Sequence, residues 1–174
     1  MNALTSASVL IWHEGVCAMT AGTDSPGVRI PPPVWYALAV IVGLVLDRQW
    51  AFPMGVPSRA ADIAGWCFVA GWAGLALVAI NRFRRSKTSF IPIRPASALV
   101  VNGPYRFTRN PMYVGLALLT IAFALFFVTW WPIILLLPAL AIVQQFVIVP
   151  EERYLRRRFD AEYEAYTRRV RRWL

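Results

Sequence analysis

The chain has 174 residues, of which 58% are hydrophobic and only 16% are charged, and its formal net charge at pH 7 is +9. This composition is too apolar for an ordinary soluble domain and indicates an integral membrane protein. The basic residues adjoin apolar segments, so they favour a membrane surface over nucleic acid as the partner. Cys17 and Cys67 lack metal-ligand spacing and His13 is the only histidine, which argues against a disulfide, a zinc site and histidine catalysis.

The N-terminal region differs from the rest of the chain. Residues 1–28 contain a weak apolar run that is interrupted by His13 and Glu14, and no basic segment precedes it. We therefore do not expect a cleaved signal peptide. We assign residues 1–30 to an N-terminal tail or interfacial segment, and the prolines at 31–33 separate it from residues 31–174, which form the membrane domain.

Four apolar segments are close to the length of about 20 residues that a transmembrane helix needs. They predict an all-α integral membrane bundle of about four transmembrane helices, at residues 33–52, 61–80, 111–130 and 132–149. The second segment is rich in alanine and glycine, which allows close helix packing, so we expect it at the centre of the bundle. The third and fourth are joined by Trp130, Trp131 and Pro132, which indicates a tight hairpin.

The distribution of basic residues predicts the orientation. Fifteen of the eighteen lysines and arginines lie either in residues 82–109 or after Pro150. The positive-inside rule puts both stretches in the cytoplasm. With four spans, both termini are then cytoplasmic, and the inner membrane is the expected location.

The segment after Pro150 has the pattern of an amphipathic helix, which we expect over residues 150–173. Apolar and aromatic residues recur at spacings of three and four, namely Leu155, Phe159, Tyr163, Tyr166, Val170 and Trp173. This stripe is expected to pack either on the bilayer interface or on the loop at residues 81–110. Both arrangements make the helix a lid over the cytoplasmic end of the bundle.

Asn110 and Pro111 mark the start of the third span. We expect the Asn110 side chain to cap the helix and Pro111 to occupy its first position. The free N–H groups and positive dipole end of such a helix favour an anion, and Arg106 and Arg109 add positive charge. The alternative is an ordinary capped transmembrane helix whose arginines reach the interface.

Glu151 and Glu152 follow Pro150 and are the acidic residues expected nearest to this basic segment. Adjacent helical residues diverge by about 100°, so we expect only one of them to face a given site. The alternative is structural, because acids favour the first turn of a helix and Glu152 could pair with Arg156. The sequence contains no GxSxG or HExxH motif and no Cys/His pair suited to nucleophilic catalysis, so a reaction here should depend on positioning more than on proton transfer.

Several motifs occur together in a recognisable order: Gly-Pro-Tyr-Arg at 103–106, Arg-Asn-Pro-Met-Tyr-Val-Gly at 109–115, and the glutamate pair at 151–152. The segment from Lys87 to the C-terminus resembles the membrane methyltransferases that include isoprenylcysteine carboxyl methyltransferase and the phospholipid methyltransferases. The chain departs from this group in two places. Many relatives have His at the position of Asn110, and prenylcysteine-specific members have an arginine just before the glutamates, where this chain has none. We therefore do not expect prenylcysteine as the substrate.

The resemblance implies S-adenosylmethionine as methyl donor, bound on the cytoplasmic side between residues 103–115 and the tail, with a lipophilic or small acceptor or a membrane lipid as partner. Arg109 and the helix start would hold the donor's carboxylate, and a glutamate with tyrosine rings would hold its amino group and sulfonium. The candidate catalytic residues are Glu152 and Arg109. The candidate cofactor-binding residues are Gly103, Tyr105, Arg109, Asn110, Pro111, Tyr113, Gly115, Glu151 and Tyr163.

Two other functions stay open at this point. One is an NADPH-dependent membrane reductase of the sterol-reductase type, although a dinucleotide requires more binding surface than four short spans and one loop offer. The other is a non-enzymatic membrane protein whose arginines bind anionic lipid. That reading explains the charge and the helix start, but it does not explain why the three motifs occur together.

Overall fold

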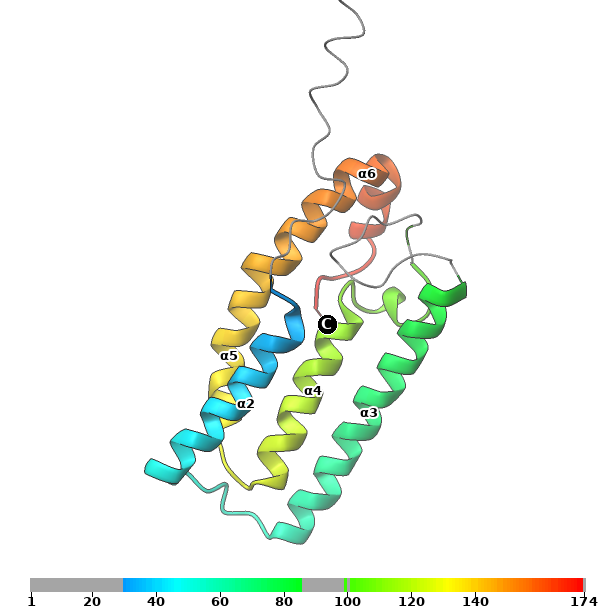
Figure 1. Cartoon of the computed structure of the whole chain (residues 1–174). Helices are drawn as coiled ribbons and strands as arrows, with labels where there is room; N and C mark the ends of the chain where they lie inside the picture. The colour runs from blue at the N-terminus through cyan, green and yellow to red at the C-terminus, as the bar shows by residue number, and fades with distance from the viewer. Residues whose placement is uncertain (1–29, 86–98, 100, 174) are drawn as a thin grey trace, which may run out of the picture.

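The computed structural model describes residues 30–85, 99 and 101–173, and the regular elements within them are all helical (Figure 1). The sequence-based prediction of an all-α fold is confirmed for this part of the chain. The elements are α2 (Pro32–Gln49), α3 (Ser58–Arg85), the 3₁₀ turn η1 (Gly103–Arg106), α4 (Pro111–Phe126), α5 (Trp131–Val143), the π-helical turn η2 (Gln144–Ile148) and α6 (Val149–Thr167). Because η2 joins α5 to α6 without a break, these three elements form one long helix.

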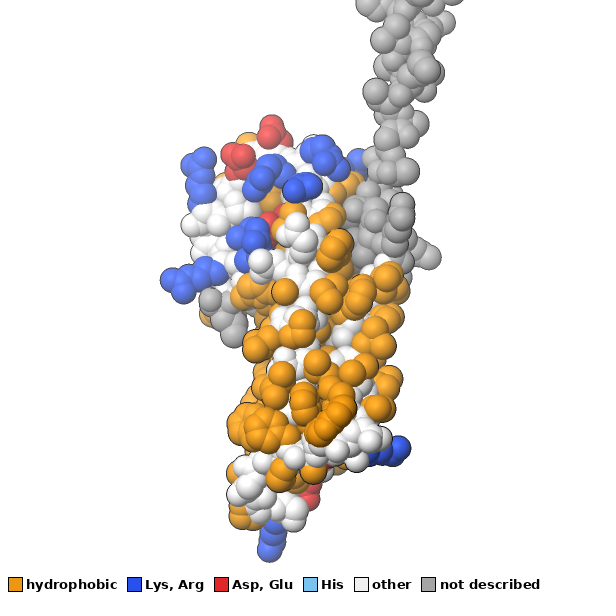
Figure 2. Space-filling view, turned by 90° about the vertical axis from the view of Figure 1, so that its left-hand side faces the viewer, with side chains coloured by type: hydrophobic (Ala, Val, Ile, Leu, Met, Phe, Trp, Pro, Cys, Tyr) orange, Lys and Arg blue, Asp and Glu red, His pale blue; other side chains and the backbone are white. Residues whose placement is uncertain are grey.

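Two helices are long and apolar enough to cross a membrane, Ser58–Arg82 and the continuous helix Trp131–Thr167, and Pro111–Phe126 is a shorter apolar helix. Large apolar side chains such as Ile63, Leu77 and Leu137 are more than 60% exposed. On the face seen in Figure 2, apolar side chains cover the middle of the molecule and charged ones gather toward its ends. A lipid environment would cover this apolar surface, and the crossing of all four helices stays a prediction.

The central helix of the bundle is α4, which packs against α2, α3 and α5. The expectation that residues 61–80 would be central is therefore wrong, since α3 packs mainly against α4 and η1. Gly65 does permit close packing, because an added Cβ would lie 2.5 Å from the Phe126 ring, but Ala70 and Gly74 are exposed. Small residues allow a close approach without determining how many neighbours a helix has.

A polar cluster joins the helices at the end of the bundle far from α6. The Asp47 carboxylate accepts hydrogen bonds from the Thr129 hydroxyl at 2.7 Å and from the Phe52 amide at 3.1 Å. The Trp131 indole donates to the Trp50 carbonyl at 2.7 Å. These contacts fasten the C-terminal end of α2 to the α4–α5 connection, which has the predicted hairpin arrangement.

The tail is shorter as a helix than the sequence pattern predicts. Helix α6 bends at Asp160, where φ is +35°, and ends at Thr167. The following residues turn back toward the start of α4, where Thr108 and Arg171 form an isolated parallel β-bridge. The apolar stripe nevertheless faces inward, because Tyr163 and Val170 are buried.

The tail packs on the loop, which is one of the two surfaces expected for it. The hydroxyl of Tyr166 donates a 2.8 Å hydrogen bond to the carbonyl of Tyr105 in η1. The predictions for residues 1–29, including Cys17 and His13, and for Lys87 and Arg94 lie outside the described residues.

Candidate functional site

The site begins with the loop that connects α3 to α4. Gly103 has a φ of +69°, a conformation that disfavours other residues, and a Cβ there would lie 3.0 Å from Nε of Arg82. The chain then forms η1, which buries Pro104 and Tyr105. Gly103 therefore turns the loop beside α3 and brings residues 105–110 to the end of the bundle.

Asn110 precedes α4, as predicted, but its side chain does not cap the helix. Its side-chain Nδ2 instead donates a 2.9 Å hydrogen bond to the carbonyl of Arg172, and its backbone N–H donates to the Thr108 hydroxyl at 3.2 Å. The prediction of a side-chain cap is wrong, because an amide group in this position bonds to the returning tail. Asn110 thus connects the start of α4 to the C-terminal segment.

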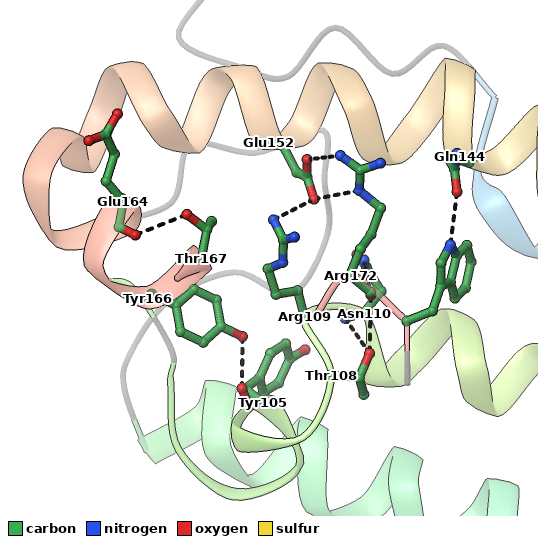
Figure 3. Close-up of polar contacts among 11 residues, drawn as sticks. Tyr105, Thr108, Arg109, Asn110, Gln144, Glu152, Glu164, Tyr166, Thr167 and Arg172 are labelled. Carbon is green, nitrogen blue, oxygen red and sulfur yellow. Dashed lines mark hydrogen bonds and ion pairs between the residues drawn. The ribbon is translucent and has the colours of Figure 1, made fainter. Parts of the chain in front are cut away.

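Glu152 stands at the centre of an ion-pair cluster (Figure 3). Its Oε1 accepts from Arg109 Nη1 and from Arg172 Nε, both at 3.0 Å, and its Oε2 accepts from Arg172 Nη2 at 2.7 Å. The Glu152 side chain is 11% exposed and that of Arg109 is 16% exposed. These contacts replace the alternative pair with Arg156, which is exposed. One carboxylate therefore serves two guanidinium groups, and the cluster has a net positive charge.

Arg109 keeps an unused donor in this cluster. Its Nε is buried and has no hydrogen-bond partner among the described residues. A buried N–H without an acceptor is unfavourable by about 1–3 kcal/mol. Arg109 can therefore offer Nε to an acceptor group of a ligand without giving up its bond to Glu152.

Glu151 has different surroundings from its neighbour. Its Oε2 accepts a 3.0 Å hydrogen bond from the Tyr113 hydroxyl, whereas both ion pairs found in the described part of the chain end on Glu152. Burial raises the pKa of Glu151 to about 7, although the bond from Tyr113 lowers it and the nearby Glu152 raises it further. The two carboxylates diverge to different partners, as adjacent helical residues should, and which of them faces a ligand stays a prediction.

Tyrosine rings surround the two glutamates. Tyr163 is buried and its ring centroid lies 6.1 Å from that of Tyr166. Burial raises the pKa of the Tyr163 hydroxyl to about 12, and Glu152 raises it as well, while Arg109 lowers it. Burial also raises the pKa of the Tyr105 hydroxyl, and the nearby Glu151 carboxylate raises it further. Tyrosine rings therefore lie near both carboxylates, and Glu152 is also bound by two guanidinium groups.

Most of the predicted site residues come together here. The contacts above join Tyr105, Arg109, Asn110, Tyr113, Glu151, Glu152 and Tyr163 at one end of α4. Pro111 begins α4 as expected. Gly115 does not face this cluster, because a Cβ there would lie 3.3 Å from the Trp72 ring of α3.

Two contributors to the site were not predicted, Arg172 and Trp173. The indole of Trp173 donates a 2.9 Å hydrogen bond to Oε1 of Gln144 in η2. In the sequence, Arg172 is one of several tail arginines and Trp173 is one member of an apolar stripe. No local pattern distinguishes Arg172 from Arg171, whose side chain is exposed.

The arrangement suits a ligand that carries both charges. Arg109 offers a buried N–H to an anion, and Glu151 offers a carboxyl group that no arginine pairs with among the described residues. Tyrosine rings nearby can face a cation. No group of three or more potential metal ligands occurs in the residues that the structure describes.

The comparisons with known proteins identify the family of the chain. The family model of the phospholipid methyltransferases matches residues 61–162, which include α4, the loop before it and the glutamate pair. The chain is also similar to an uncharacterized protein of Haemophilus influenzae, at 36% identity over 66 residues, which is 36% of this chain and the whole of that relative. No solved structure matches the chain. Because the family model covers more than half of its residues, the chain belongs to the phospholipid methyltransferase family.

Proposed function

We propose that the protein transfers a methyl group from S-adenosylmethionine to a lipophilic or small acceptor at the cytoplasmic face of the membrane. The family is one of methyltransferases, and the apolar helices together with the family indicate a membrane protein. One observation carries the choice of donor. A buried N–H of Arg109 that has no partner among the described residues lies at the same end of α4 as the carboxyl group of Glu151, and the donor's amino-acid moiety has the two complementary charges.

Arg109 is proposed to hold the donor's carboxylate. Its Nη1 is engaged with Glu152, and its buried Nε has no partner among the described residues, so Nε can bind a ligand without breaking that contact. A charge-assisted hydrogen bond from guanidinium to carboxylate is among the stronger protein–ligand contacts. Glu152 then acts through Arg109 by fixing the direction of its guanidinium, instead of touching the ligand itself.

Glu151 is proposed to hold the donor's amino group. It has no arginine partner in the described residues, whereas Glu152 is already neutralised by two. A cation near Glu151 would stabilise the ionised carboxylate and return its pKa toward the ordinary range. The two adjacent glutamates therefore take different roles, one toward the ligand and one toward Arg109.

The bound donor would supply an electrophilic methyl group on a sulfonium centre. The tyrosines at this end of the bundle offer ring faces that favour a cation and exclude water. Methyl transfer is an in-line displacement, so alignment of the two reactants can provide much of the rate. The exposed apolar surface of the helices favours an acceptor that partitions into lipid.

The test is calorimetric titration of the detergent-purified protein with S-adenosylhomocysteine, with NADPH titrated in parallel. Saturable binding of the former alone supports the proposal, and binding of NADPH alone would move the protein to the reductase class. Binding of neither would favour a protein that binds anionic lipid without catalysis.

A matched pair of variants tests the site. Arg109→Met is expected to weaken S-adenosylhomocysteine binding at least about tenfold, because it removes a charge-assisted contact. Arg153→Met makes the same chemical change at an exposed position of α6 and should bind like the wild type. Equal affinities in both variants would refute the assignment of Arg109.

A further inference from the structure

The C-terminal segment Arg168 to Trp173 is bound to the site by several polar contacts. The carbonyl of Arg171 accepts from the Arg109 amide at 3.0 Å, and the carbonyl of Arg172 accepts from the Thr108 hydroxyl at 3.2 Å as well as from Asn110. The Trp173 indole is bonded to η2, and Val170 is buried. The segment is therefore held in place by both its backbone and its side chains (Figure 3).

The two oxygens of Glu152 are shared unequally between its arginine partners. Arg172 bonds to both oxygens, through Nε to Oε1 and through Nη2 to Oε2. Arg109 bonds only to Oε1, through Nη1. Arginine–carboxylate pairs frequently form two parallel bonds of this kind, which fix their geometry as well as adding binding energy. Arg172 therefore fixes the position of the Glu152 carboxylate, to which Arg109 adds a single bond.

The consequence concerns Nε of Arg109. The bond from Arg109 to Glu152 uses Nη1, which lies on a different edge of the guanidinium from the N–H of Nε. While the carboxylate is held in place, this single bond keeps the guanidinium in the orientation that leaves Nε without a partner among the described residues. We propose that Arg172 is a positioning residue that keeps Arg109 Nε available for an anionic ligand group by fixing the Glu152 carboxylate through both of its oxygens. This inference rests on the proposed function for the identity of the ligand, but the ion-pair geometry itself does not depend on it.

The experiment titrates S-adenosylhomocysteine into the full-length wild type and into R172M, R172K and R171M. We expect R172M to bind at least about tenfold more weakly, since it leaves a buried carboxylate with one partner. R172K keeps the charge but cannot make two parallel bonds, so its affinity should lie between those of R172M and the wild type. R171M removes the same charge from an exposed side chain and keeps the backbone carbonyl that Arg109 uses, so it should bind like the wild type.

A purely structural role for Arg172 would give a different result. In that case R172M would unfold at a lower temperature, yet its folded fraction would bind with wild-type affinity, and the proposal would be overturned. If R172M does not fold, R172K decides the question, because a folded R172K with wild-type affinity would also overturn the proposal.

A second readout requires no ligand. Hydrogen exchange of the Arg109 amide, which donates to the tail carbonyl, should be faster in R172M than in the wild type and unchanged in R171M. Equal exchange in R172M and R171M would overturn the inference. If the wild type failed to bind S-adenosylhomocysteine, the proposed function would fall, and the exchange result alone would decide whether Arg172 organises the Arg109 segment.

Discussion

Each end of the helical bundle joins its helices through a carboxylate, but the two clusters are built differently. At one end Asp47 accepts from a hydroxyl and a backbone amide, both of them neutral donors. At the other end Glu152 is bound by two guanidinium groups, and Glu151 beside it keeps a carboxyl group whose pKa is raised to about 7. Both clusters connect distant segments of the chain, so the connection alone does not indicate function.

The difference lies in what each cluster leaves unused. At the Asp47 end, the carboxylate and its partners satisfy one another. The Glu152 end retains a buried donor on Arg109 and a carboxyl group without a cationic partner among the described residues. A surplus of binding groups costs stability and persists where a ligand uses it. We therefore expect substitutions at the two ends to separate stability from binding.

The largest effect is expected for Glu152→Ala, which leaves two guanidinium groups without their carboxylate. Removal of one partner from a buried ion pair destabilises proteins by about 3–5 kcal/mol. Thermal unfolding in detergent should occur at a clearly lower temperature, and S-adenosylhomocysteine binding should be lost. Glu164→Ala, at an exposed position on the same helix, is the control, and an equal effect of both changes would contradict the central position of Glu152.

Asp47→Ala should lower stability by about 1–3 kcal/mol, because the buried Thr129 hydroxyl loses its acceptor. The affinity for S-adenosylhomocysteine should stay the same, since this cluster lies at the opposite end of the bundle. Thr129→Val removes the same bond from the other side and should behave alike. A change in ligand affinity in either variant would break the distinction between the two ends.

The raised pKa of Glu151 predicts that ligand affinity and stability depend on pH, and Glu151→Gln should abolish this dependence. If its carboxylate binds the ligand's amino group, affinity should rise about tenfold from pH 6 to pH 8, as the carboxyl group ionises around pH 7. Without ligand the sign is reversed. A carboxyl group whose pKa is raised by folding stabilises the protein fully below its unfolded value of about 4.5, and this stability is lost as the pH rises through about 7. Calorimetry and thermal unfolding across this range measure both slopes, and slopes unchanged in the glutamine variant would exclude Glu151 as their source.

Tyr113→Phe should have the smallest effect, about 1 kcal/mol of stability, because it removes one hydrogen bond to Glu151. That bond lowers the pKa of Glu151, so its loss should move the midpoint of the binding profile to higher pH. Tyr154 lies two residues after Glu152 and is also buried, so Tyr154→Phe is the control for the loss of a buried tyrosine hydroxyl as such. A midpoint that moves downward after Tyr113→Phe would contradict the direction of the Tyr113 contact.

The sequence predicted the helical class and the segments that form the site, because both depend on local patterns. Hydropathy locates the helices, and the Asn110–Pro111 start is a local signal. The arrangement of the glutamates is not local. The π-helical turn at Gln144–Ile148 changes the helical phase between α5 and α6, so a regular helix extrapolated from α5 misplaces the side chains that follow it.

The partners of Glu152 were equally beyond a local pattern. A pairing with Arg156 four residues on satisfies helix geometry, whereas the observed partners are 43 and 20 residues away in the chain. The tail bends at Asp160 and leaves the helix after Thr167, which brings Arg172 to the site. A periodic stripe predicts which face is buried, and it was confirmed for Tyr163 and Val170, but it does not reveal where a helix stops.

The hydrogen bond between Asn110 and the carbonyl of Arg172 joins residues 62 positions apart, and this has a consequence for biosynthesis. Segments that are synthesised first can fold before later ones have been added, so α2, α3 and α4 can form before Arg172 and Trp173 are present. The contacts of Arg172 with Glu152 and of Trp173 with Gln144 are therefore the last to form. A chain that ended before Arg171 would have the segments for these helices without the residues that tie the tail to the start of α4 and to η2.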